Sequence, residues 1–360
     1  MKIPADLLAR PAEEAVRRLA LVQLERAAAA RSQLVEGDRE EALHDFRVAL
    51  RRLRSLLRSH RSVFAVEFPK KVLRRLAALA RDTNPGRDAE VQLAWLATFT
   101  DELKPNERAG HGEIVRELAE RRDESYRKVE REIVRDFAAI AEDLGSRLIN
   151  YRVSVDLERP SRPPNFAAAT RDALGRGGEE LFENLTRIES AADEAAGHAA
   201  RIAAKRLRYL IEPVAPWIEV ASRPVEVLRA LQDLLGELHD GQLLAAHVAH
   251  ALAEIESKRA QILIAATLDE SAGSPQTATP VRRRERAGLI AIARRLGARR
   301  SELFKNLAQN WLGDDSPLRL ELLAALKALD EELGSRPGRR LATGRQRPLP
   351  ARRTPSRLPR

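Results

Sequence analysis

The sequence contains no cysteine, so disulfide bonds, thiolate zinc sites and cysteine nucleophiles are excluded. Aromatic residues make up only 4% of the 360 residues, whereas the helix-favouring residues Ala, Leu, Arg and Glu are abundant. No stretch approaches the ~20 uninterrupted apolar residues of a transmembrane helix, and residues 1–31 hold no apolar run followed by a small-residue cleavage site. We therefore expect an all-α protein of the reducing cytoplasm, neither exported nor spanning a membrane.

Acidic residues are absent from residues 335–360, which carry nine arginines and five prolines. The formal net charge of the whole chain is +10, so this tail holds nearly all of it and the rest is close to neutral. We expect a disordered Arg/Pro-rich tail that binds nucleic acid weakly. Any anion site in the folded part must then come from positive charge gathered on one surface.

Apolar residues recur at helical spacing along almost the whole chain, and Pro and Gly fall between the periodic segments. The proline-rich segment 159–165 is predicted to be a linker, and the Ser/Thr/Gly/Pro-rich segment 271–280 an exposed loop. The predicted helices span residues 11–35, 39–60, 69–82, 88–102, 112–143, 166–188, 192–212, 223–237, 240–268, 283–311 and 316–334.

A basic segment occurs twice, at a constant offset of 154 residues. Residues 44–54 read HDFRVALRRLR and residues 198–208 read HAARIAAKRLR. Downstream, residues 73–79 echo residues 228–234 in their Leu and Arg positions. The pattern indicates a duplicated helical unit. The predicted divisions are a first half at 1–158, a second half at 159–312, an extra helix at 313–334 and the tail at 335–360.

Each copy of this segment carries basic side chains on one helical face. Because an α-helix turns ~100° per residue, the basic positions of the first copy fall within roughly 80° and run for about 21 Å. Phe46, Leu50 and Leu53 fill the adjoining arc, so a buried apolar face would hold the cations beside the core. We call the two sets the basic stripes: His44, Arg47, Arg51, Arg54 and Arg58 in the first copy, and His198, Arg201, Lys205 and Arg208 in the second.

A single basic helix is usually a solvated face whose arginines pair with acids on neighbouring helices, and a lone histidine is usually structural. Two stripes at matched phase, each beginning with His and each free of acid, favour a bound polyanion instead. Like charges three or four residues apart on a helix repel each other. Phosphate groups would offset that repulsion, because guanidinium groups pair with phosphate oxygens in a bidentate manner.

With these stripes the sequence resembles the CHAD domain, the conserved histidine α-helical domain. The resemblance covers about residues 10–312 and is carried by blocks 43–54, 84–91, 198–209 and 231–240. It implies two four-helix-bundle-like halves, related by a pseudo-twofold axis, whose basic stripes line a central groove that binds inorganic polyphosphate. The next helix of each half would add Lys71, Arg74, Arg81 and Arg229. Glu212 stands where the first copy has Arg58, and His239-Asp240 replaces Arg87-Asp88, so the first half is expected to bind more strongly.

The sequence offers no support for catalysis. Some CHAD proteins are fused to a triphosphate-hydrolysing CYTH domain with an ExExK motif on a strand, but Glu130 and Glu132 are predicted to lie on a helix, where their side chains diverge. The pairs His44-Asp45 and His239-Asp240 lack further metal ligands nearby in the sequence, and there is no Walker-type loop or GxSxG motif. We therefore expect neither an enzyme nor a cofactor or metal site.

The predicted function is non-catalytic binding of inorganic polyphosphate, with targeting to polyphosphate granules in the cytoplasm. A nucleic-acid-associated protein is the main alternative, favoured by the arginine-rich tail and the pI near 10.3. The folded part lacks the aromatic residues that stack on bases, which disfavours that alternative. A helical interaction scaffold is a third hypothesis, based on the long Glu/Arg-rich segment 112–143.

Overall fold

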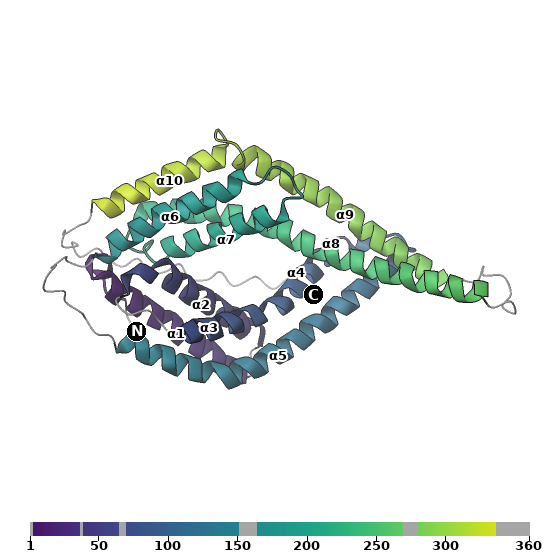
Figure 1. The fold of residues 1–360 in the computed structure, drawn as a ribbon, viewed down its shortest axis with the longest axis horizontal. Coiled ribbons are helices and arrows are strands. Elements are labelled where there is room, and N and C mark those ends of the chain that lie inside the picture. Colours follow the sequence, from purple (N-terminus) through teal and green to yellow (C-terminus); the bar gives the residue numbers. More distant parts are fainter. Residues whose placement is uncertain (1–2, 37–38, 65–69, 151–163, 269–279, 336–360) are drawn as a thin grey trace, which may run out of the picture.

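A computed structural model describes residues 3–36, 39–64, 70–150, 164–268 and 280–335 (Figure 1). Within these ranges the chain forms α-helices and short 3₁₀ helices and no β-strand, which confirms the all-α prediction for this part of the chain. The α-helices are α1 (Ala12–Glu36), α2 (Arg39–Ser59), α3 (Lys70–Asp82), α4 (Asn84–Ala97), α5 (Arg108–Ile149), α6 (Phe166–Thr186), α7 (Glu194–Ile211), α8 (Ser222–Leu268), α9 (Pro280–Trp311) and α10 (Pro317–Gly334). The 3₁₀ helices are η1 (Leu7–Ala9), η2 (Arg61–Val63), η3 (Thr100–Glu102) and η4 (Glu219–Ala221).

The larger of two hydrophobic cores runs from α1, α2 and α5 through α6, α7 and α8 to α10. In α2 the predicted apolar arc is buried, since Phe46, Leu50 and Leu53 are each 0% exposed. The ring of Phe46 meets that of Phe137 on α5 edge to face, with ring centroids 5.0 Å apart. This packing fixes the rotation of α2, and so keeps the neighbouring basic stripe at the margin of the core.

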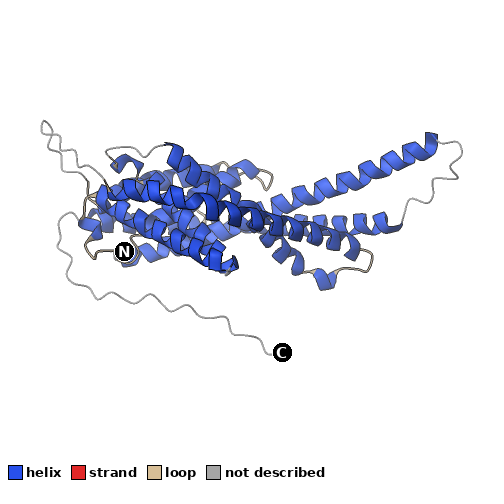
Figure 2. Ribbon diagram, turned by 90° about the horizontal axis from the view of Figure 1, so that it is seen from below, coloured by secondary structure: helices blue, strands red, loops and turns tan. Residues whose placement is uncertain are grey.

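The smaller core lies where α4, α5, α8 and α9 meet. The backbones of α5 and α9 approach each other at Gly110 and Gly288, where a Cβ atom would overlap the carbonyl groups of Glu285 and Glu107. Only glycine allows so close a crossing. Beyond this point α8 and α9 continue as a projecting arm (Figures 1 and 2).

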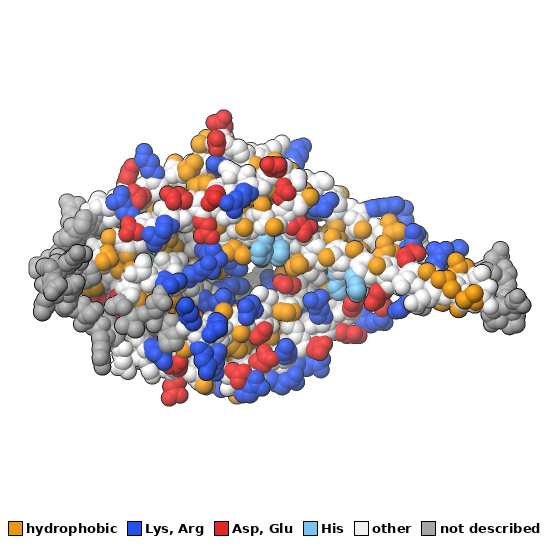
Figure 3. Space-filling model, in the orientation of Figure 1, with side chains coloured by type: hydrophobic (Ala, Val, Ile, Leu, Met, Phe, Trp, Pro, Cys, Tyr) orange, Lys and Arg blue, Asp and Glu red, His pale blue; other side chains and the backbone are white. Residues whose placement is uncertain are grey.

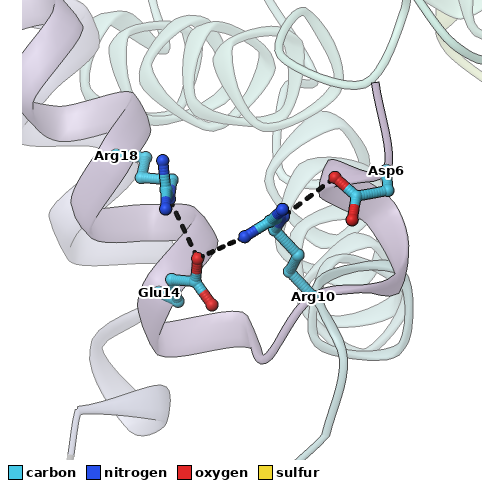
Figure 4. Close-up of polar contacts among 4 residues, drawn as sticks. All are labelled: Asp6, Arg10, Glu14 and Arg18. Atoms are coloured by element: carbon cyan, nitrogen blue, oxygen red, sulfur yellow. Dashed lines mark hydrogen bonds and ion pairs between the residues drawn. The ribbon is translucent and has the colours of Figure 1, made fainter. Parts of the chain in front are cut away.

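The chain before α1 runs beside the chain before α6, because the amide of Phe166 donates to the carbonyl of Arg10 (2.9 Å). The guanidinium of Arg10 also bridges Asp6 (2.9 Å) and Glu14 (2.7 Å), and Arg18 donates to the same Glu14 oxygen (2.9 Å; Figure 4). Such partly exposed pairs contribute little free energy individually. All four residues belong to the N-terminal segment and α1, so the pairs fix how this segment enters α1. Helix α1 contacts α6, and α2 packs on α7.

The prediction of two helices at 223–237 and 240–268 was wrong, because α8 runs unbroken from Ser222 to Leu268. Gly236 and Gly241 flank the expected break, but a single glycine costs a helix only about 1 kcal/mol. Here Leu235 and Leu238 pack in the larger core and Leu244 in the smaller one, which holds the helix together on both sides of the expected break.

Helices α4, α5 and α9 begin three or four residues earlier than predicted, α9 at Pro280 instead of residue 283. Helix α4 starts at Asn84 instead of residue 88, since Pro85 occupies its first turn, where the missing N–H group breaks no hydrogen bond. Helix α5 extends from Arg108 to Ile149, beyond the predicted 112–143. None of the described helices is both long and apolar enough to cross a membrane.

Several predicted features fall outside the described residues: most of the linker 159–165, most of the loop 271–280, and the tail from residue 336. The proposed boundary between the halves 1–158 and 159–312 falls there too, so this division remains a prediction. Helix α10 occupies the place of the extra helix predicted within 313–334.

Candidate functional site

The two basic stripes come together where α2 packs on α7. Lys205 of α7 shows this most clearly, because its ammonium group is partly buried and is influenced by guanidinium groups from both helices. This burial and its cationic neighbours lower the pKa of Lys205 to about 7, the neighbours being, in descending order of effect, Arg51, Arg201, Arg208 and Arg47. Arg47 and Arg51 are on α2, so the stripes share one site.

Further cations extend this site along α2. Burial, followed by the charges of Arg81 on α3 and Arg58, lowers the pKa of Arg54. Burial and then Arg58 lower the pKa of Arg206 on α7. In Figure 3, Lys and Arg side chains gather on this face beside a hollow bordered by histidines. We call the following residues the basic cluster: Arg47, Arg51, Arg54 and Arg58 of α2, Arg81 of α3, and Arg201, Lys205, Arg206 and Arg208 of α7.

Most of the basic cluster has no counter-ion. Within the described part of the chain, seven of its members make no ion pair: Arg47, Arg51, Arg54, Arg58, Arg81, Arg201 and Lys205. The Nε atom of Arg51 is buried and has no acceptor. A buried donor without an acceptor loses its hydration and gains nothing in return. The site is therefore electrostatically strained and suited to receive anionic oxygen atoms.

The remaining members near the end of α7 are partly neutralised. Glu212 accepts from Arg208 (Nη1–Oε1, 3.0 Å) and pairs with Arg52 of α2 (Nη2–Oε2, 3.1 Å). Arg208 also donates to Gln232 of α8 (3.1 Å) and lies over the ring of Tyr209. The carboxylate at the position matching Arg58 thus holds two guanidinium groups.

Arg47 has a structural contact as well as a place in the cluster. Its side chain is only 8% exposed, and Nη1 donates to the carbonyl of Thr83, between α3 and α4. Burial and then Arg51 lower the pKa of Arg47 to about 10, so the group is still charged at neutral pH. Through this hydrogen bond, Arg47 also holds α2 against the turn between α3 and α4.

Carboxyl groups and histidines border the cluster at the α4 and α8 side. Burial raises the pKa of Asp88, against the opposing charges of Arg47 and Arg201, and burial also raises that of Asp240. The rings of His198 and His239 lie 4.8 Å apart. Burial, then Arg201 and His198, lowers the pKa of His239 to about 4.

The two stripe histidines have related environments. Burial and then Arg201 and Lys205 lower the pKa of His198. His44 lies at an exposed edge of the site, where partial burial and then Arg51 lower its pKa. All three histidines at this site, His239 included, are therefore neutral at pH 7 and able both to donate and to accept hydrogen bonds.

The CHAD domain family model matches residues 18–249, which include both stripes, α4 and the first half of α8. The chain belongs to the CHAD domain family. Its fold is similar to the crystal structure of the CHAD domain from the plant Ricinus communis, with a TM-score of 0.57 and 20% sequence identity over 91% of this chain and 95% of that chain. At this identity the likeness shows a shared fold. No curated protein matches the chain.

In this CHAD protein, three residues predicted for the site are exposed on α3 and α8. Lys71 and Arg74 are exposed on α3, and Arg74 donates to the carbonyl of Lys70 (3.3 Å). Arg229 is exposed on α8. None of the three is among the main charges that lower the pKa of Arg47, Arg54, Lys205 or Arg206. Of the predicted next-helix residues, only Arg81 joins the cluster.

Sequence reasoning missed three basic residues at the CHAD site. Arg52 and Arg206 occupy matching positions of the repeat, and each pairs with an acid, Arg206 with Glu180 (2.6 Å). Arg87 lowers the pKa of both His44 and Arg47. The repeat could have identified these residues. Arg52 and Arg206 are separated by the repeat offset of 154 residues, and residues 87–88 echo residues 239–240.

No metal site is evident in the part of the CHAD chain that the structure describes, where no three His, Cys, Asp or Glu side chains are grouped to hold an ion. Glu130 and Glu132 lie on α5, as predicted for a helix, and Glu132 is 3.9 Å from Lys128. The chemistry that the site can perform with its own residues is electrostatic binding.

Proposed function

We propose that this CHAD protein binds inorganic polyphosphate, without catalysing its reaction, in a groove lined by the basic cluster. The observation that carries the proposal is the set of seven clustered cations without an ion pair in the described residues, including Arg51 with its buried Nε atom. Polyphosphate presents a row of anionic oxygen atoms, which guanidinium groups bind through charge-assisted hydrogen bonds. Polyphosphate binding is also the role expected from membership of the CHAD family.

The proposal includes a two-part groove. The repeat places equivalent cations on α2 and α7, and the electrostatic contact of Lys205 with Arg51 is consistent with one ligand spanning both helices. We propose that the two halves are related by a pseudo-twofold axis and that each contributes one stripe. His44 and His198 would then donate to phosphate oxygens at equivalent places.

We further propose that the first half contributes more affinity than the second. Glu212 already pairs with Arg52 and Arg208, so a phosphate must compete with it for those groups. Arg51 and Arg54 have no such competitor within the described residues. Lys71, Arg74 and Arg229 are exposed on α3 and α8 and serve, in this proposal, as outer contacts for longer chains.

The cellular consequence of the proposed function is localisation. A protein that holds many phosphates along one polymer gains avidity from each additional contact. We therefore propose that the protein is retained on polyphosphate granules in the cytoplasm.

The affinity for polyphosphate should fall as the pH is raised from 7 to about 9.5. Burial and then Arg51 and Arg201 lower the pKa of free Lys205 to about 7, whereas a bound polyanion favours the charged ammonium and raises this pKa. Binding above pH 7 therefore takes up a proton, and deprotonation of Lys205 opposes it. Titration calorimetry in two buffers of different ionisation enthalpy measures this uptake.

The matched control is Lys205→Arg, which keeps a positive charge at every pH in this range. This variant should bind with little dependence on pH and without proton uptake. The pKa values of His44, His198 and His239 are lowered, so these histidines titrate below the pH range of this experiment. Undiminished proton uptake by Lys205→Arg would contradict the role given to Lys205.

Deleting residues 336–360 should separate the proposed function from nucleic-acid binding. The deletion removes nine arginines, so the affinity for RNA should fall steeply, as counter-ion release requires. The affinity for long-chain polyphosphate should change by less than about threefold, since the basic cluster is retained. Fluorescence titration with RNA and polyphosphate of matched phosphate content measures both. An equal loss for both ligands would place the anion site in the tail.

A further inference from the structure

A cavity separate from the basic cluster lies between α4, α8 and α9. It encloses about 510 Å³, its open mouth included. Its apolar lining comes from Trp95 of α4, Leu238 and Leu244 of α8, and Leu296 and Leu303 of α9. Cavities with a largely apolar lining and a few polar groups commonly hold small organic molecules.

One polar side chain lines this cavity without a hydrogen-bond partner. Gln92 of α4 is only 6% exposed, and its Oε1 atom is buried and has no partner. An amide oxygen accepts up to two hydrogen bonds, and burying it unpaired is unfavourable. The oxygen is therefore placed to accept from a donor that enters the cavity.

Four charged residues line the cavity, and two of them, Arg299 and Glu237, pair with each other. Arg299 of α9 pairs with Glu237 of α8 and with Glu302 (2.9 Å). Asp240 lies beside the cavity, but the charges of Arg201 and Arg87 act on its carboxyl group. Arg300 also lines the cavity and makes no ion pair within the described residues, but it is exposed, so solvent screens its charge. The buried lining is mostly apolar, so an uncharged ligand is favoured there.

We propose that this cavity binds a flat, uncharged heteroaromatic molecule whose N–H group donates to Oε1 of Gln92. The ring system of such a molecule fits among the four leucines and beside the indole of Trp95. Indole is the simplest probe of this class, because it has one ring system and one N–H donor. The site is independent of polyphosphate binding and goes beyond it.

The hydrogen bond is tested by changing its donor and its acceptor separately. Calorimetry or ligand-observed NMR with the full chain should show that indole binds about tenfold more tightly than 1-methylindole, which has no donor. Gln92→Met keeps the length of the side chain and removes its polar atoms. In this variant the two probes should bind equally, at about the affinity of 1-methylindole for the unaltered protein. Equal binding of both probes to the unaltered protein would overturn the proposed contact.

The location is tested by filling the cavity. A Cβ atom at Gly241, which lines the cavity, would meet no heavy atom within 4 Å, and leucine favours a helix more than glycine does. Gly241→Leu should therefore fold and lose indole binding. The control is Gly236→Leu on the same helix, where the added Cβ also meets nothing and the residue is not part of the lining. This control should keep indole binding. Undetectable indole binding to the unaltered protein, or unchanged binding by Gly241→Leu, would overturn the proposal.

Discussion

Replacing Arg51, Arg54 and Lys205 together with glutamine should weaken the binding of long-chain polyphosphate by about a thousandfold or more. Each replacement removes a cation that makes no ion pair within the described residues, so each should cost a charge-assisted contact of ~1.5–3 kcal/mol. The helices should persist, because buried residues such as Leu50 and Leu53 are unchanged. Titration calorimetry measures the affinity, and circular dichroism measures the helical content.

A control variant with the same loss of charge separates the site from general attraction. Arg26 of α1, Arg131 of α5 and Arg294 of α9 are exposed and lie outside the basic cluster. Changing these three residues to glutamine should weaken binding by less than about tenfold, since screening reduces the effect of distant charges. If both triple variants lost the same affinity, polyphosphate would be held by net charge and the groove proposal would fail.

Saturating long-chain polyphosphate should raise the melting temperature of the protein by about 5 °C or more. A ligand that binds only the folded state, at a hundredfold excess over its Kd, stabilises that state by about 2.7 kcal/mol. The unpaired cations of the basic cluster repel one another in the free protein, and bound phosphates relieve that repulsion. Differential scanning fluorimetry measures the shift.

Orthophosphate at the same phosphate concentration is the comparison for this measurement. Single phosphates bind independently, whereas a linear chain that has made one contact holds its other phosphates near the remaining cations. Orthophosphate should therefore produce a much smaller shift, and added salt should reduce the shift caused by the polymer. Equal shifts from the two ligands at low salt would rule out a site that spans both stripes.

Periodicity and repetition were sufficient to predict the helices that carry the site. The arc of Phe46, Leu50 and Leu53 in α2 predicted which face is buried, and the structure confirms it. The matching phase of the two copies suggested that Arg51 and Lys205 serve one site, and their electrostatic contact is consistent with that. These features depend on local spacing, which a single sequence contains.

The pairing of individual cations could not be predicted, because it depends on contacts between distant segments. Glu212 pairs with Arg52, which is 160 residues away, and Arg47 donates to the backbone of Thr83. Lys71 and Arg74 are on the expected helix and are exposed. A stripe of basic residues therefore indicates which face of a helix carries the positive charge, but not which of the charges lack an ion pair.

The break expected in α8 shows that tertiary packing can also override a local sequence preference. Gly236 and Gly241 lower the local helix propensity only slightly. Tertiary packing of Leu235, Leu238 and Leu244 outweighs this effect. Two cores share this one helix, which sequence periodicity alone does not reveal.

The long separation between the two stripes has a consequence for how the protein reaches its folded state. Arg51 and Lys205 lie 154 residues apart in the chain, so their helices meet only after a long segment has been synthesised and folded back. That late docking step brings cations toward cations, and repulsion raises its barrier. A polyanion present at that moment would screen the repulsion and speed the docking of α7 on α2. If polyphosphate is the ligand, the yield of folded protein would then rise with the polyphosphate content of the cell, because the ligand would assist the folding of the protein that binds it.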